Sequence, residues 1–136
     1  MRWDDQHKLA HVVLRKMGES TLLVREGLAV YLSQDNLDVD LRSYSRVQSQ
    51  RGLLPSIMKL IEDAEFQKMG VDVTFPAAGS FIRYLVEEYG MDKVKLLYSQ
   101  LRPGDPGLKF RKVFNQIFAQ RVEEVDVLWQ TNSTAQ

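Results

Sequence analysis

Two histidines, His7 and His11, stand four positions apart in the stretch HKLAHVVL. Residues i and i+4 lie on the same face of a helix, so both imidazole rings can point at one place. Imidazole is a common zinc ligand, and a catalytic zinc usually takes three protein ligands and keeps one position open. The pair raises the hypothesis of a metal site; the alternative is two surface or partly buried histidines with no ligand role.

Glu26 is the natural candidate for the third ligand, because it lies fifteen residues beyond His11 on a second predicted helix. The intervening MGES turn gives the chain room to reverse direction and lay the second helix antiparallel to the first. Gly27 and Ala29 are small, so the two helices could approach closely. The spacing therefore favours a site built from two imidazoles and one carboxylate.

The elements that must position these residues are predicted to be helical throughout. Apolar residues recur at helical spacing, and Gly and Pro residues mark the breaks. Ser20 or Thr21 is expected to cap the second helix, and Pro76 to open the fifth after a loop of about a dozen residues. We expect an all-α fold, a compact bundle of seven or eight short helices, near 5–17, 21–34, 41–50, 55–63, 76–89, 91–101, 108–120 and 122–130.

The chain is expected to form one domain over 1–136. Within it, 1–34 holds the metal-site helix pair, 35–75 the connecting helices and a loop, 76–130 the C-terminal helices, and 131–136 a frayed tail. The small residues of AAGSF, at 77–81, favour close packing between helices over a phosphate-binding turn.

Composition excludes several classes of function. The 18 basic and 18 acidic side chains cancel, which argues against a nucleic-acid partner. Lys109, Arg111 and Lys112 are predicted to form the solvated face of a helix. The chain has no cysteine, so disulfides and thiolate metal ligands are excluded. We expect no membrane span and no signal peptide, because no apolar stretch is long enough, and nothing in the sequence indicates a compartment.

Taken in order, three segments resemble the gluzincin zinc metallopeptidases of the peptidase MA-like group. HKLAH followed by LLVREGLAVYL is similar to that group's HExxH motif and its EGxA-type helix. FPAAGSFIRYLVEEYGMDKVKLLYSQL is similar to the helix pair that follows, and VEEVDVLW to the closing helix. The resemblance runs from His7 to Trp129 and implies zinc ligands at His7, His11 and Glu26.

The chain departs from the group's pattern in three ways. Lys8 occupies the position of the glutamate that acts as general base, and a protonated lysine cannot accept a proton. At about 5 Å from the metal its ammonium would be repelled by roughly 3 kcal/mol per unit charge, with an effective dielectric near 20. Only six residues precede His7, so the β-containing subdomain that holds substrate has no counterpart here. Phe75 stands where members of the group often have tyrosine.

The resemblance therefore implies a degenerate metallopeptidase-like domain or fragment, inactive as a peptidase, in which the zinc ligands persist without the base. The rival hypothesis is a metal-free helical interaction module whose former cleft holds a peptide or protein partner. A helix face left uncovered by the absent subdomain would also allow self-association. A third alternative is a generic helical bundle with accidental histidines.

Overall fold

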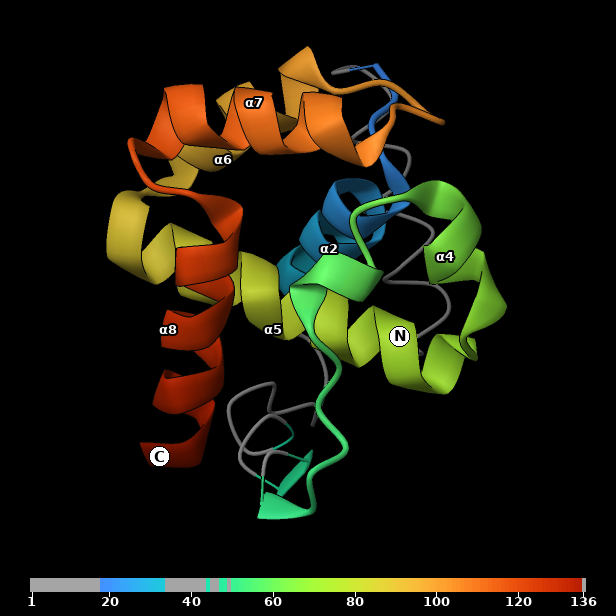
Figure 1. Cartoon of the computed structure of the whole chain (residues 1–136), viewed down its shortest axis with the longest axis vertical. Coiled ribbons are helices and arrows are strands. Elements are labelled where there is room, and N and C mark those ends of the chain that lie inside the picture. The colour runs from blue at the N-terminus through green and yellow to red at the C-terminus, as the bar shows by residue number, and fades with distance from the viewer. Residues whose placement is uncertain (1–17, 34–43, 45–46, 49, 136) are drawn as a thin grey trace.

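The structure, a computed structural model, describes residues 18–33, 44, 47–48 and 50–135. Over these residues it contains six α-helices, one short 3-10 helix and no strand. Figure 1 shows how these elements are arranged. The all-α prediction is confirmed, and the described part holds slightly fewer helices than the seven or eight expected. The helix predicted near 5–17 lies outside the described residues, as does most of the one predicted near 41–50.

The long helix α5 runs across the middle of the molecule, and the other helices pack around it (Figure 1). Helix α2 lies against α5, α8 crosses its C-terminal half, and α6 and α7 stack at one end. None of the described helices combines the length and apolar character needed to cross a membrane. The elements in chain order are α2 (Leu22–Ser33), η3 (Ile57–Lys59), α4 (Asp63–Lys68), α5 (Val71–Tyr89), α6 (Met91–Gln100), α7 (Gly107–Phe118) and α8 (Val122–Ala135).

Helix α2 packs on α5 through a glycine. A Cβ added at Gly27 would lie 2.6 Å from Ile82 Cγ1 and 2.7 Å from the carbonyl oxygen of Ala78, so only hydrogen fits there. Ala77 and Ala78 are fully buried on the facing side of α5. The prediction that AAGSF serves close helix packing is confirmed, because α2 approaches α5 closely where Gly27 lies against Ala78.

Helix α5 begins at Val71, five residues before Pro76. The carbonyl of Gly70 accepts bonds from Val73 N at 2.9 Å and Thr74 N at 3.0 Å, which closes the first turn. Pro76 then falls in the second turn, where its missing N–H costs one backbone bond close to the helix start. Sequence reasoning placed the start at the proline; the earlier start puts Phe75 on the helix instead of in a loop.

One buried acid, Asp126, and one tryptophan, Trp129, attach α8 to α5 and η3. Trp129 of α8 donates from Nε1 to Ser80 Oγ at 3.1 Å and meets Phe81 edge to face at 5.5 Å between ring centres. Asp126 of α8 accepts from Ser56 Oγ at 2.6 Å and from Ile57 N at 3.1 Å. These bonds hold η3 against α8. The segment 55–63, expected as one short helix, instead contains η3 and ends where α4 begins.

The start of α2 is capped from another helix. Asp63, the first residue of α4, accepts from Leu22 N at 2.8 Å through Oδ1 and from Gly104 N at 2.9 Å through Oδ2. Ser20 and Thr21, the expected caps, are fully buried, and their hydroxyls make no hydrogen bond within the described part of the chain. Sequence reasoning favours a local hydroxyl cap; here a carboxylate 41 positions away supplies it.

At the C-terminus, α8 continues as a helix to Ala135, through most of the segment 131–136 that was expected to be a tail. Gly90 separates α5 from α6 with a φ of 94°, a conformation that favours glycine, as its place between two helical patterns suggests. The break predicted between the helices near 91–101 and 108–120, where the sequence reads RPGDPG, is confirmed, since α6 ends at Gln100 and α7 begins at Gly107.

Candidate metal site around Glu26

Glu26 lies on α2, one residue before the glycine that packs against α5. Only 7% of the residue is exposed, so its carboxylate belongs to the interior edge of the fold and not to the solvated surface. It lines a cavity of about 230 Å³ formed between α2, α4 and the start of α5. Glu26 is thus a buried carboxylate on the wall of a cavity.

The cavity wall is largely apolar. Phe66 of α4 and Phe75 of α5 face each other with ring centres 6.4 Å apart, and Thr74 directs its hydroxyl to the carbonyl of Gly70 at 3.3 Å. Glu26 is the one acidic or basic residue among the described residues of the wall. The full lining comprises Leu22, Glu26, Phe66, Gln67, Met69, Val71, Thr74 and Phe75.

A neighbouring cation partly offsets the cost of burying this carboxylate. Arg25 Nε lies 3.5 Å from Glu26 Oε1, close enough for a charge interaction but long for a hydrogen bond. An ionised carboxylate in apolar surroundings needs a cation or hydrogen-bond donors to remain stable. Arg25 supplies such a cation to Glu26.

Tyr98 of α6 belongs to the same electrostatic neighbourhood. Burial raises the pKa of its phenol, the Arg25 guanidinium opposes that shift, and the carboxylates of Glu19 and Glu26 add to it. The hydroxyl donates to the carbonyl oxygen of Gly18 at 2.9 Å. Tyr98 thus stays neutral at physiological pH and ties the segment preceding α2 to α6.

The other residues of the predicted site, His7, Lys8 and His11, lie outside the described residues. The ligand set His7, His11 and Glu26 accordingly stays a prediction. Over residues 18–33 and 50–135, no three His, Cys, Asp or Glu side chains cluster in a way that could hold a metal ion. A zinc site in this protein would need the histidines to complete it.

The structure does bring together two residues that the resemblance singled out, Glu26 and Phe75, on the wall of one cavity. Sequence reasoning missed Phe66 and Met69, which form much of the rest of that wall. It took 64–75 for a loop, although the spacing of Phe66 and Met69 is typical of one face of a helix turn. From that spacing the sequence could have predicted a helix in this segment.

Comparison with protein-family models, with curated proteins and with solved structures found no match to this chain. The likeness to the gluzincin group consequently rests on the residues and motifs of the sequence alone.

Proposed function

We propose that this chain is a degenerate metallopeptidase-like domain in which His7, His11 and Glu26 hold a zinc ion while the general base of peptide hydrolysis is absent. The observation that carries the proposal is the burial of Glu26 against a cavity, with 7% of the residue exposed. Glutamate is seldom buried unless it is paired, and Glu26 has Arg25 Nε 3.5 Å from its Oε1.

The donor set fits zinc chemically. Two neutral imidazole nitrogens and one carboxylate oxygen are the ligands of many catalytic zinc sites. The apolar wall around Glu26 lowers the local polarity, which strengthens attraction between the carboxylate and a bound cation. Arg25, at 3.5 Å from Glu26, competes for the same carboxylate and would weaken metal affinity.

Lys8 explains why the domain would not be a peptidase. A bound zinc would act as a Lewis acid toward a peptide carbonyl. The chain must still supply a group that accepts a proton and later passes it to the leaving amine, and a protonated Lys8 cannot accept one. Phe75 offers no hydroxyl to the cavity that it shares with Glu26, so it cannot donate to a developing negative charge.

The test is a calorimetric zinc titration of metal-stripped protein, followed by NMR of the two histidine rings. We expect one zinc per chain, with the His7 and His11 signals shifting together. Glu26→Gln keeps the shape but removes the charge, and we expect it to weaken zinc binding by about tenfold or more. Glu88→Gln, on the exposed side of α5, makes the same charge change away from the site and serves as the control.

Failure of either ring to respond to zinc would refute the proposal. Equal weakening by Glu26→Gln and Glu88→Gln would also refute the role of Glu26, because it would show a general charge effect.

A metal-free helical interaction module is the second candidate, and a specific observation favours it. Four large apolar side chains of the described residues are at least 60% exposed: Leu53, Val71, Leu108 and Val127. Val71 also lies at the rim of the Glu26 cavity. Light scattering would detect self-association through such surfaces; a strictly monomeric protein would exclude the self-associating form of this hypothesis.

A further inference from the structure

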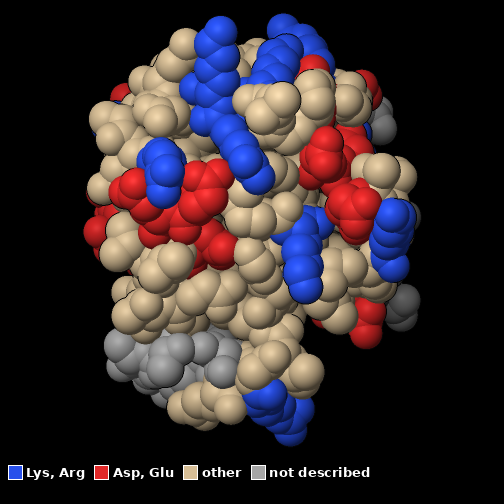
Figure 2. Space-filling view, viewed as in Figure 1, with Lys and Arg blue, Asp and Glu red and all other residues tan. Residues whose placement is uncertain are grey.

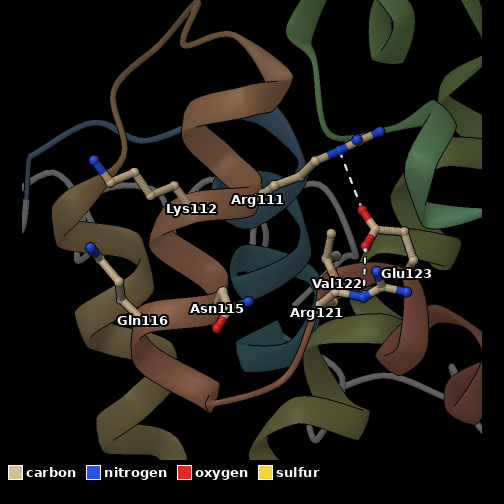
Figure 3. Close-up of a pocket in the computed structure, with 7 residues that line it drawn as sticks. All are labelled: Arg111, Lys112, Asn115, Gln116, Arg121, Val122 and Glu123. Carbon is tan, nitrogen blue, oxygen red and sulfur yellow. Dashed lines mark ion pairs between the residues drawn. The ribbon is translucent and has the colours of Figure 1, made fainter.

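The hollow between α7 and α8 is lined by charged groups that pair with one another. In Figure 3 the side chains of Arg111 and Arg121 extend toward Glu123, with Nε–Oε distances of 3.3 Å and 3.8 Å. Arg121 Nε also lies 3.1 Å from Glu124 Oε1. Figure 2 shows basic and acidic side chains next to one another on the face that it views. Exposed ion pairs of this kind contribute little to the position of a helix.

The start of α2 is held differently, by side chains of two other helices that bind its backbone. Tyr98 of α6 donates from its hydroxyl to the carbonyl oxygen of Gly18 at 2.9 Å, across 80 positions of the chain. Asp63 of α4 accepts from Leu22 N at 2.8 Å, across 41 positions. Tyr98 is 1% exposed, so its hydroxyl has little access to competing water. Segment 18–22 therefore lies where α4 and α6 place it.

The hydroxyls of segment 18–22 take no part in these contacts. Ser20 and Thr21 are fully buried, and neither hydroxyl makes a hydrogen bond within the described part of the chain. A hydroxyl at a helix start ordinarily accepts a bond from the first turn, and burying it without a partner costs free energy. Contacts with distant residues thus override the local preference of the sequence here. Departures of this kind are expected at functional sites.

Segment 18–22 connects the two parts of the proposed ligand set. His11 precedes Gly18 by seven positions, and Glu26 follows Leu22 by four. Residues four apart lie on one face of a helix, and Leu22 and Glu26 line the same cavity. A constraint on segment 18–22 is therefore a constraint on how the chain passes from the histidines to Glu26.

We propose that Tyr98 is a positioning residue of the zinc site and acts through its hydrogen bond to the Gly18 carbonyl. Tyr98 has this role only if zinc binds as proposed above, to the two histidines and Glu26. Ligands that are held in place before the metal arrives lose less freedom on binding, which raises the affinity. Removing the bond would leave every ligand in the chain but widen the range of directions from which segment 18–22 enters α2.

The experiment compares zinc binding by the metal-stripped wild type and by Tyr98→Phe in calorimetry. The variant keeps the ring and loses only the hydroxyl. We expect one zinc per chain in both proteins, with the affinity of the variant lower by about fivefold, the scale of one neutral hydrogen bond. With Co²⁺ in place of zinc, the visible absorption depends on the coordination geometry, and we expect its band intensities to change in Tyr98→Phe.

Two matched variants separate positioning from stability. Tyr89→Phe also removes a tyrosine hydroxyl that donates a hydrogen bond, here to Gln120 Oε1 at 2.6 Å. It should lower stability in urea by a similar amount, yet leave the zinc affinity and the cobalt spectrum unchanged. Thr21→Val removes a hydroxyl of segment 18–22 that makes no hydrogen bond within the described part of the chain, and it should also leave both unchanged.

Equal zinc affinity and equal cobalt spectra in the wild type and Tyr98→Phe would overturn the role of Tyr98 and leave the proposed zinc site standing. Equal weakening by Tyr98→Phe and Tyr89→Phe would overturn that role as well, because the affinity would then follow overall stability. Absence of zinc binding by the wild type would overturn the zinc site and the role of Tyr98 together.

Discussion

Replacing Gly27 tests the packing that positions Glu26. At a solvent-exposed position inside a helix, Gly→Ala stabilises a protein by about 1 kcal/mol, because alanine loses less backbone entropy on folding. At Gly27 the added Cβ would lie 2.6 Å from Ile82 Cγ1 and 2.7 Å from Ala78 O, whereas ordinary contacts begin at 3.4 Å. The two effects have opposite signs, so the sign of the stability change decides between them.

The magnitude follows from which atoms can move. The Ile82 side chain can adjust its rotamer, but the carbonyl of Ala78 belongs to the backbone of α5 and moves only with that helix. Overpacking of this kind costs about 1–3 kcal/mol, and backbone overlap places Gly27→Ala near the upper end. After the gain of about 1 kcal/mol in helix propensity, we expect a net loss of roughly 2 kcal/mol. Gly27→Val should lose more.

Urea and thermal unfolding followed by circular dichroism would measure this change. For a chain of 136 residues, a loss of about 2 kcal/mol corresponds to a fall in Tm of roughly 6–8 °C. Gly107→Ala is the control, because a Cβ there would lie 3.4 Å from its nearest neighbours and would fit. If Gly27→Ala raised stability, the close contact between α2 and α5 would be refuted, and with it the support for the placement of Glu26.

Three further predictions address charge and buried bonds. Lys8→Glu should raise zinc affinity by about tenfold or more in calorimetry, because it removes a positive charge close to the proposed metal site. Unchanged affinity would show that Lys8 does not lie close to the metal. Above pH 10 the free energy of unfolding should fall as pH rises. Burial raises the pKa of Tyr98, so the folded state keeps the phenol proton at a pH at which the unfolded state has already lost it. Tyr98→Phe should make that fall smaller, and an identical pH profile would contradict the assignment. Asp126→Ala removes the acceptor of two hydrogen bonds to η3 and should cost about 2–4 kcal/mol in urea unfolding, whereas Asp92→Ala, exposed on α6, should cost less than about 1 kcal/mol.

Local patterns in the sequence were sufficient to predict the helical class and, within two residues, both bounds of α2, α6 and α7. The second helix, predicted over 21–34, is α2 (Leu22–Ser33), and the break at Gly90 falls between α5 and α6. These features depend on apolar spacing and on the conformational freedom of glycine, both of which act over a few residues. Trp129, at the end of the segment VEEVDVLW, lies in the core and is 1% exposed.

Features that depend on distant residues could not be predicted in the same way. The cap of α2 comes from Asp63, and the anchor of η3 from Asp126, 70 positions beyond Ser56. The start of α5 was misplaced because Pro76 is tolerated in the second turn when the Gly70 carbonyl closes the first. The cavity wall beside Glu26 was missed for the same reason, since Phe75 joins it only when the helix begins at Val71.

The double role of Asp63 has a consequence for how the molecule opens. One carboxylate holds the amides of Leu22 and Gly104, each 41 positions away along the chain, and it sits on the six-residue helix α4. Fraying of α4 would release both amides in a single event, so they should exchange their hydrogens with solvent at a common rate. The first turn of α2, which leads directly to Glu26, would loosen in the same event. Leu22 lines the Glu26 cavity, so the same event would loosen part of that cavity's wall.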